Sequence, residues 1–571
     1  MTDRFTVPPG APGISPRWTS SAKGAVGTAA NAGSRVWFTI SHGILNEIYA
    51  PRLDMACIRD FGFIVTADGY FSEEKRDTTQ TGEMLEDGVP AYRLVHTARD
   101  GRYRITKTIF ADPEREVVLQ DVSFEALVGT GADYAVHAIV APHLVNAGSG
   151  NTAWYGDFKG HSMLFAEGRG TFLAVASSVP WLARSAGFVG VSDGWQTLLR
   201  GEGLRPDYQR AENGNVALSG TIDLAAGGGR ALLAIGFGAQ AEEAAFRTLI
   251  SLQRGAGPAL ADFRTGWRHW QETLLPLDQP RDEKGLNRYR VSTMVMASHR
   301  EPSSGAIIAS LSIPWGSSKG DDDLGGYHLV WPRDLVEIAG GLLAAGATDA
   351  AEGVLGYLMA VQEADGHWVQ NSWLDGRPYW GGVQMDETGF PILLYDMLVR
   401  AGAIDRSETL RYARLIEAAA GYIVRNGPST QQDRWEEDGG YSPFTLAVEI
   451  AALLAAADAI ETAGKSSAAQ YLREVADGWN ERIETWTYAV DTELSRRLGI
   501  EGYYVRIGDA SNSGQDALHG RVAIRNRADT NASLEAISLI SPDALALVRF
   551  GLRAADDPRI RNTVIAIDAV L

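Results

Sequence analysis

The chain has 571 residues, of which 45% are hydrophobic and 22% are charged, and this balance is typical of a globular protein rather than a disordered one. Its formal net charge of −19 excludes a general surface for nucleic acid or for an anionic membrane. Cys57 is the single cysteine, so the chain can form neither an intrachain disulfide nor a zinc site built on thiolates.

The N-terminal residues lack the basic start and apolar core of a secretory signal, and no stretch reaches the roughly 18 consecutive apolar residues that span a bilayer. We therefore expect a cytoplasmic protein with no membrane partner. The sequence contains no phosphate-binding loop, dinucleotide fingerprint or serine-nucleophile elbow, and its central histidines lack metal-ligand spacing. We expect neither a cofactor nor a metal, and the oligomeric state stays open.

Residues 1–240 are predicted to form an antiparallel β-sandwich. Short β-rich runs are separated by Gly, Pro and Asp, and apolar residues alternate cleanly over 134–140. The run 103–109 has the same alternation except that Lys107 interrupts it. Many such strands in series, without long helical patterns between them, favour two packed sheets.

The sequence period becomes helical after about residue 240. Residues 241–284 are predicted to be a helical linker, and residues 285–571 a helical domain with about nine helices. Ser442-Pro443 predicts the start of one helix, because a serine cap and a proline in the first turn both favour a helix N-terminus. One face of that helix carries Leu446, Ile450, Leu453, Ala457 and Ile460.

The loops of the helical domain carry tryptophans beside acidic residues. Flat aromatic faces stack on the C–H faces of sugar rings, while carboxylates, amides and arginine bind the hydroxyls, so these loops predict a carbohydrate site. The alternative is that the aromatic side chains pack on one another in a lid-like surface. Six of the fifteen tryptophans lie in this region: Trp315, Trp331, Trp368, Trp373, Trp380 and Trp435.

Two segments combine charged and aromatic residues at predicted helix starts. In Gly325–Asp334, the adjacent Arg333 and Asp334 either form a charged fork for sugar hydroxyls or merely suit the dipole of the helix. In Tyr379–Glu387, Trp380 either offers a stacking platform or belongs to a glycine turn before a helix that its first acids cap.

A third segment, Asp433–Tyr441, contains three consecutive acids between a tryptophan and a Gly-Gly turn. Like charges and apolar contacts both raise the pKa of a carboxyl. A carboxylic acid that stays protonated near neutral pH can give its proton to the oxygen of a leaving group. The alternative is a solvated acidic loop.

Taken in order, these segments resemble glycoside hydrolase family 15, the glucoamylases, and most closely its bacterial branch. The resemblance covers nearly the whole chain, and the ordered set of segments is highly specific. The other segments that carry it are Gly13–Lys23, Ser41–Tyr49, Ile308–Ser310, Arg434–Glu437 and Ser541–Leu545.

This resemblance implies an N-terminal β-sandwich, a helical linker and an (α/α)6 barrel. It also implies an inverting, exo-acting hydrolase that releases glucose from the non-reducing ends of α-glucans. The expected partner is an α-glucan or a malto- or isomalto-oligosaccharide. Inversion needs one carboxyl that protonates the glycosidic oxygen and a second, about 6.5–9.5 Å away, that activates water.

The family motifs also imply residue roles. Glu436, the first Glu of Trp-Glu-Glu, corresponds to the general acid, and Glu437 helps to bind the sugar at the cleavage site. Arg333 and Asp334 grip the terminal glucose, near which Tyr327 packs. The remaining predicted binding residues are the loop tryptophan Trp380, its supports Gln384 and Asp386, and the motif tryptophans Trp331 and Trp435.

The sequence departs from the family at its C-terminal end. The motif that carries the general base is absent, and a closed barrel of this type has more helices than the roughly nine predicted here. The last predicted helix ends at Leu571 without glycine, proline or a polar cap. We therefore expect a helical barrel that is incomplete in this chain, with the general base beyond residue 571.

Three alternatives to an α-1,4-specific hydrolase stay open on the sequence alone. The same scaffold could act on α-1,6 links, as in glucodextranases, or transfer glucosyl units, because the residues around the terminal glucose would be shared. A catalytically inactive carbohydrate-binding protein would keep Trp380 and Arg333 but lack the general base.

Overall fold

The computed structural model describes residues 7–19, 23–312, 320–321, 326–512, 514–524 and 532–571. Trp315 and some residues of the family segments, such as Gly325, lie outside these ranges. The chain divides into two compact units, Met1–Ser303 with Ile308–Leu329, and Ser304–Ile307 with Val330–Leu571.

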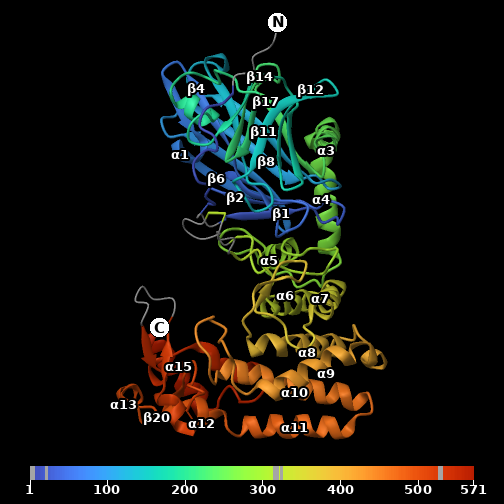
Figure 1. Cartoon of the computed structure of the whole chain (residues 1–571), viewed down its shortest axis with the longest axis vertical. Coiled ribbons are helices and arrows are strands. Elements are labelled where there is room, and N and C mark those ends of the chain that lie inside the picture. Colours follow the sequence, from blue (N-terminus) through green and yellow to red (C-terminus); the bar gives the residue numbers. More distant parts are fainter. Residues whose placement is uncertain (1–6, 20–22, 313–319, 322–325, 513, 525–531) are drawn as a thin grey trace. The chain divides into compact units, whose positions relative to one another are not determined.

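Two antiparallel sheets form most of the first unit, which confirms the predicted sandwich (Figure 1). The eight-stranded sheet has the order β1-β2-β3-β4-β10-β16-β14, with β5 paired to β4. Its strands are β1 (Ala25–Thr28), β2 (Trp37–Ser41), β3 (Ile44–Tyr49), β4 (Ala56–Ala67), β5 (Tyr70–Glu73), β10 (Ala135–Pro142), β14 (Trp181–Phe188) and β16 (Val216–Ile222).

The nine-stranded sheet has the order β15-β11-β12-β13-β17-β9-β8-β7-β6. Its strands are β6 (Thr78–Glu86), β7 (Val89–Ala98), β8 (Tyr103–Ala111), β9 (Val117–Ala126), β11 (Asn151–Phe158), β12 (His161–Gly168), β13 (Thr171–Ser177), β15 (Arg210–Gly214) and β17 (Arg230–Gly238).

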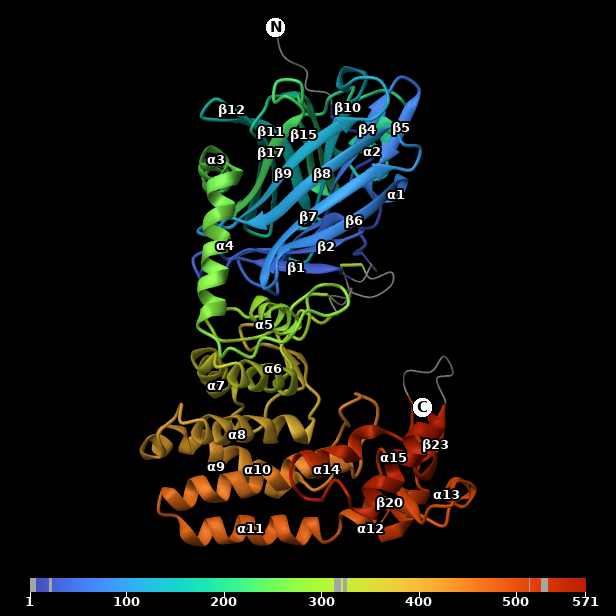
Figure 2. The ribbon, with the colours of Figure 1, turned by 180° about the vertical axis from the view of Figure 1, so that it is seen from behind.

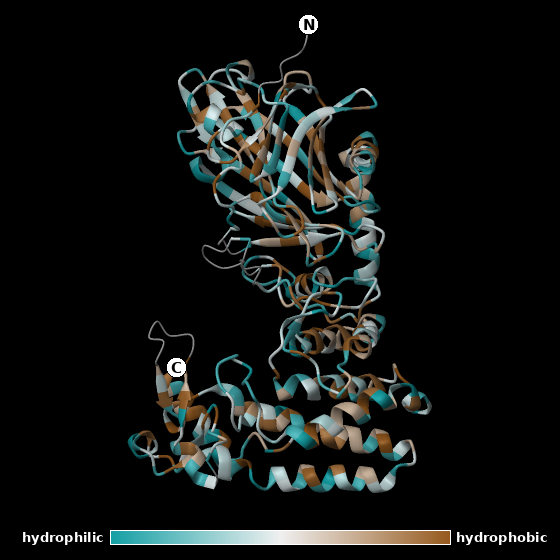
Figure 3. Cartoon of the chain, in the orientation of Figure 1, coloured by the Kyte–Doolittle hydropathy of each residue, from teal (hydrophilic) through white to brown (hydrophobic). Residues whose placement is uncertain are grey.

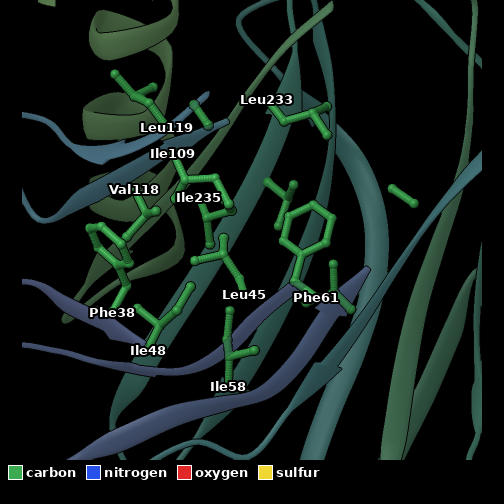
Figure 4. Close-up of a cluster of buried hydrophobic side chains, with 14 of the residues drawn as sticks. Phe38, Leu45, Ile48, Ile58, Phe61, Ile109, Val118, Leu119, Leu233 and Ile235 are labelled. Atoms are coloured by element: carbon green, nitrogen blue, oxygen red, sulfur yellow. The ribbon is translucent and has the colours of Figure 1, made fainter. Parts of the chain in front are cut away.

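The core of the first unit lies between the two sheets. Along the strands, apolar and polar segments alternate, as Figure 3 shows, and the alternate residues Val136, Ala138 and Val140 of β10 are buried. Phe61 of one sheet and Ile235 of the other belong to the same buried cluster (Figure 4). The period of two in the sequence therefore places one face of each sheet in a shared core.

Helices α3 (Ala241–Arg254) and α4 (Ala256–Glu272) follow the last strand and pack on the sandwich (Figure 2). Helix α3 contacts β13 and β17, and α4 contacts β7 and β8. The indole Nε1–H of Trp267 on α4 donates to the carbonyl oxygen of Thr28 at 2.9 Å. Three further helices belong to this unit: α1 (Glu74–Asp77), α2 (Gly194–Leu199) and α5 (Arg288–Ser298).

Lys107, which interrupts the apolar alternation of β8, is fully buried beside Glu74. Its Nζ lies 2.6 Å from Oε1 of Glu74 and donates to the carbonyl oxygen of Gly43 at 2.9 Å. His96 lies 3.3 Å from the same carboxylate oxygen. The charge is therefore tolerated in the core because a carboxylate and a carbonyl replace its water.

Replacing Lys107 with methionine should lower the free energy of unfolding by about 3–5 kcal/mol, because Glu74 would keep its burial and lose its cation. Urea denaturation followed by circular dichroism measures the change. Adding Glu74→Gln to this variant should recover part of the loss. If the double variant is less stable than Lys107→Met, the uncompensated charge of Glu74 does not explain the lower free energy of unfolding.

The second unit is built from helices that alternate between an inner and an outer layer. Inner helices α6 (Pro332–Ala344), α8 (Met385–Arg400) and α10 (Pro443–Thr462) pack in series, and each contacts the outer helix that follows it. The outer helices are α7 (Thr348–Val361), α9 (Thr409–Asn426) and α11 (Ser466–Asn480). This alternation is the arrangement of an (α/α)6 barrel, as the resemblance implied.

Further helices and strands belong to the second unit. They are the helices α12 (Ile483–Thr487), α13 (Glu493–Leu498), α14 (Ala546–Arg549) and α15 (Pro558–Val570), and the strands β18 (Asn371–Ser372), β19 (Pro378–Trp380), β20 (Tyr488–Val490), β21 (Gly502–Tyr504), β22 (Arg521–Ala523) and β23 (Ser533–Glu535).

Helix α10 begins where the sequence predicted. The Ser442 side chain accepts from the backbone N–H of Thr445, and Pro443 is the first helical residue. The helix is buried around most of its circumference, rather than along one face, because α8, α9 and α11 all pack against it. By length and composition α10 could cross a membrane, but 78% of its apolar window is buried within the unit, as in a core helix of a globular protein.

Candidate active site

The three predicted segments meet at the N-terminal ends of the inner helices. Trp331 precedes α6, Gln384 precedes α8, and the loop 433–441 leads into α10. Side chains from all three segments are joined by hydrogen bonds, so residues up to 105 positions apart in the chain form one cluster.

Arg333 in the first turn of α6 connects the first two segments. Its Nη1 donates to Oε1 of Gln384 at 2.6 Å and to Oδ2 of Asp386 at 2.8 Å, and it lies 3.7 Å from Oε1 of Glu387. The residue is only 9% exposed. Burial opposes its charge, but the Asp386 and Glu387 carboxylates outweigh this effect and raise the pKa of Arg333. The guanidinium is thus a fixed cation.

Gln384 and Asp386, predicted as supports of Trp380, are completely buried and bind Arg333 instead. Their contacts orient the guanidinium, since Arg has a planar fork of donors that two acceptors can fix. Asp334 follows Arg333 in the chain, and 44% of its side chain is exposed. Asp334 is therefore the member of the Arg-Asp pair whose side chain is accessible to solvent.

Two carboxyls of this cluster have raised pKa values. Complete burial raises the pKa of Glu387 well above its usual value, Arg333 lowers it in part, and the neighbouring Asp386, Asp334 and Glu436 raise it further. Partial burial also raises the pKa of Asp334, against the opposing effect of Arg333. The site therefore concentrates several acids around the Arg333 guanidinium.

Glu436 lies in the loop before α10 and is held by a tryptophan. The indole Nε1–H of Trp331 donates to Oε1 of Glu436 at 2.8 Å. The Glu436 backbone has φ 63°, a left-handed conformation that residues other than glycine rarely adopt. Its N–H donates to the carbonyl oxygen of Asp433 at 2.9 Å. Such strain persists only where surrounding contacts impose it, and it is common at functional sites.

Glu437 points into a separate buried ion cluster. It is 4% exposed, its backbone N–H donates to Oδ1 of Asp433 at 3.0 Å, and its Oε2 accepts from Nη1 of Arg506 at 2.5 Å. Arg506 also lies 3.4 Å from Oδ2 of Asp433. The neighbouring acids therefore have different surroundings: Glu437 is neutralised by a cation, whereas the carboxyl of Glu436 is held by an indole N–H.

The aromatic residues of the loops divide into exposed and buried groups. Trp380 on β19 is 42% exposed and packs edge-to-face on Trp331 with ring centroids 6.3 Å apart. Trp435 is 45% exposed, and its Nε1–H donates to Oδ2 of Asp543 at 2.8 Å. By contrast, Trp368 is buried and Trp331 is only 5% exposed. Trp380 and Trp435 are thus the two of these that present ring surface.

Tyr327 belongs to the first compact unit, in the segment 308–329. It is 50% exposed, and its carbonyl oxygen accepts from the backbone N–H of Ser310 at 2.7 Å. Its predicted packing near the terminal sugar stays a prediction.

Comparisons with known proteins agree along the whole chain. The family model described as "Glycosyl hydrolases family 15" matches residues 287–571, and the one described as "Glucodextranase, domain N" matches residues 8–272. A glucoamylase of Clostridium sp. (strain G0005) is 35% identical over 563 residues, which are 98% of this chain and 77% of that protein. This chain belongs to glycosyl hydrolase family 15.

Two further relatives are a glucoamylase and a glycosyl hydrolase. The crystal structure of a bacterial glucoamylase complexed with acarbose has a TM-score of 0.90 and 34% identity, over 99% of this chain and 81% of that one. An uncharacterized glycosyl hydrolase of Methanocaldococcus jannaschii is 29% identical over 31% of this chain and 27% of its own length. The fold of this family 15 member is therefore that of a glucoamylase throughout.

Sequence reasoning missed Arg506 and Asp433 of this family 15 site. Arg506 follows Glu437 by 69 residues, in a segment without a recognisable motif, and no local signal marks it. Asp433 opens the acidic segment, but nothing in its neighbourhood shows that its carboxylate would bind a backbone N–H and an arginine. Within the described ranges, no group of three His, Cys, Asp or Glu side chains could hold a metal ion.

Replacing Arg506 with leucine should lower the free energy of unfolding by about 3–5 kcal/mol, because the buried carboxylates of Asp433 and Glu437 would lose the cation that they share. We expect a loss of activity as well, since the loop that carries Glu436 depends on these contacts. Chemical denaturation and kcat/KM measure the two effects. Arg506→Lys keeps the charge and should fall between the wild type and Arg506→Leu; equal stability of all three would contradict this role.

Proposed function

We propose that this family 15 enzyme releases glucose from the non-reducing ends of α-glucans, with inversion at the anomeric carbon and with Glu436 as the general acid. The observation that carries the proposal is the Glu436 carboxyl, which an indole N–H holds at 2.8 Å beside the Arg333–Asp334 pair. The names of its relatives, glucoamylases at 34–35% identity, support the same substrate class.

In the proposed reaction, Glu436 gives its proton to the glycosidic oxygen while the bond from that oxygen to the anomeric carbon breaks. A water molecule attacks the anomeric carbon from the opposite face, and a second carboxylate takes the proton that this water loses. The product is β-glucose and a glucan shortened by one unit. We assign no described residue to the second carboxylate.

The binding residues fall into two proposed roles. Asp334 accepts hydrogen bonds from hydroxyls of the terminal glucose, while the buried Gln384 and Asp386 keep Arg333 in place beside it. The exposed rings of Trp380 and Trp435 stack on the C–H faces of sugar units. A fixed polar clamp would orient the terminal ring for attack and so lower the entropic part of the barrier.

A second candidate is hydrolysis of α-1,6 links. It is favoured by one observation, the match of residues 8–272 to the family model named for domain N of glucodextranase. The terminal glucose and the acid would be the same for both linkages, so only the orientation of the next sugar unit distinguishes them.

A product assay on the full-length enzyme tests these candidates. The enzyme is incubated with maltoheptaose, isomaltose, isomaltotriose or dextran. Glucose release and optical rotation are followed together. We expect β-glucose as the first product, released fastest from maltoheptaose. Faster release from the α-1,6 substrates would favour the glucodextranase activity, α-glucose would contradict inversion, and binding of maltoheptaose without turnover would favour an inactive binding protein.

A further inference from the structure

A cavity lies in the first unit, on the outer face of the eight-stranded sheet. In β4, Phe61 and Phe63 point into the sandwich core, so Gly62 and Ile64 line the opposite face. The cavity has a volume of about 290 Å³, near the lower limit of roughly 300 Å³ for pockets that bind small ligands. Its apolar floor comes from β3, β4, β10 and β16: Ile44, Gly62, Ile64, Ile139, Ala141 and Ala217.

One wall of this cavity is an aromatic side chain in a fixed position. Trp195 at the start of α2 lines the cavity, and its Nε1–H donates to Oε2 of Glu73 at 3.1 Å. Phe71 packs edge-to-face on the Trp195 ring, with centroids 5.7 Å apart. An immobilised indole beside an apolar floor suits the C–H surface of a sugar ring.

The lining also contains a buried acceptor that is not satisfied. Asn215 is 4% exposed and its Nδ2 donates to the carbonyl oxygen of Ile14 at 2.9 Å, but its Oδ1 has no hydrogen-bond partner within the described part of the chain. The Nε of Arg59 makes no hydrogen bond to the described residues, but it lies 3.4 Å from Oδ2 of Asp60 and so forms an ion pair. Because buried polar atoms are normally paired, Oδ1 of Asn215 points to a ligand that offers a donor, as a hydroxyl does.

The charges around the cavity balance. Three cationic and three anionic side chains line it, so the formal charge of the lining is zero. Lys75 lies 3.4 Å from Asp60, and Arg76 lies 3.3 Å from Glu73. Asp193 is occupied by the backbone N–H groups of Gly190 and Gln196. A neutral, hydroxyl-rich ligand therefore fits this cavity better than a phosphate or a cation does.

We propose that this cavity binds a glucosyl unit of the α-glucan, as a second carbohydrate site apart from the residues around Glu436. The inference rests on the proposed function for the identity of the sugar, and on the cavity itself for the binding of a neutral ring. A second site on the same chain raises the effective concentration of a polymeric substrate without a new contact to the reacting bond.

The first test counts binding sites on the full-length enzyme. Glu436→Gln slows turnover about 10²–10⁴-fold, so that isothermal titration with maltoheptaose gives the number of sites per chain. We expect two sites. Adding Ala141→Phe, which fills the cavity floor, should leave one, whereas Ala225→Phe on an exposed turn of the same unit should leave two. One site before the Ala141→Phe change, or two sites after it, would overturn the proposal.

The second test uses activity and a variant that does not fill the cavity. In the otherwise wild-type enzyme, Ala141→Phe and Arg59→Met should leave kcat and KM for maltose unchanged. Both should weaken the binding of soluble starch about tenfold, which corresponds to roughly 1.4 kcal/mol. Unchanged starch binding in both variants would overturn the second site while leaving the proposed function intact. If the wild-type enzyme released no glucose from maltose, that result would instead contradict the proposed function.

Discussion

Replacing Glu436 with glutamine is expected to lower kcat on maltoheptaose by about 10²–10⁴-fold, the usual contribution of a general acid. The amide keeps the size and the acceptor oxygen of the carboxyl, so the bond from the Trp331 indole at 2.8 Å can persist and the strained loop need not change. Binding of maltoheptaose should therefore stay within a few-fold of the wild type.

A second substrate, α-glucosyl fluoride, provides the control for this variant. Fluoride departs from α-glucosyl fluoride with little help from an acid, so Glu436→Gln should retain most of the wild-type rate on that substrate. The side of the pH profile of kcat/KM that falls as pH rises, which reports deprotonation of the acid, should disappear for the variant. An equal loss of rate on maltoheptaose and on glucosyl fluoride would show that Glu436 does something other than protonate the leaving group.

Trp331→Phe tests the contact that holds this acid. The ring is 5% exposed, so phenylalanine should keep most of the packing and remove the indole N–H that donates to Glu436. We expect a smaller decrease in kcat than for Glu436→Gln, because the acid would remain but would be less well oriented.

Local patterns in the sequence were enough to predict much of the fold. Alternation over 134–140 reflects a strand with one face in a core, and Ser442-Pro443 marks the first turn of α10 because capping is decided by neighbouring residues. The same reasoning could not predict that α10 would be buried on nearly every side. That depends on three other helices, which no pattern within α10 reveals.

The site shows the same division between local and long-range information. Family motifs led to Arg333, Asp386 and Glu436, and the structure joins their three segments at the ends of three inner helices. The motifs did not reveal that Gln384 and Asp386 would bind Arg333 rather than support Trp380. The partner of Glu437 comes from position 506, and a long-range ion pair has no signature in either local sequence.

Arg333→Leu is expected to lower the stability of the enzyme strongly. Asp386 and Glu387 are both completely buried, and Arg333 is the cation that lies 2.8 Å from the first and 3.7 Å from the second. Removing it leaves buried carboxyls without a countercharge, for which we expect a decrease of about 3–5 kcal/mol in the free energy of unfolding. Sugar binding should be lost too, since Asp334 would lose its neighbour.

Arg549→Leu is a matched control, because Arg549 also pairs with a carboxylate, that of Glu337 on α6. Its Nη1 lies 2.6 Å from Oε1 of Glu337, but the side chains of this pair are 54% and 34% exposed. A solvent-exposed ion pair contributes about 0–1 kcal/mol, so this variant should be close to the wild type in stability. A similar loss in both variants would mean that burial is not what makes Arg333 important.

The pH dependence of the Arg333→Leu defect follows from the direction of the pKa shift. Burial already holds the pKa of Glu387 well above its usual value, and Arg333 acts against that shift, so its removal raises the pKa further. A carboxyl whose pKa is higher in the folded than in the unfolded state binds more protons when folded, and stability then falls as the pH rises between those two values. The difference between Arg333→Leu and the wild type should therefore be smaller at pH 5 than at pH 8, as measured by urea denaturation. A difference that is the same at both pH values would show that the defect comes from lost packing rather than from uncompensated charge.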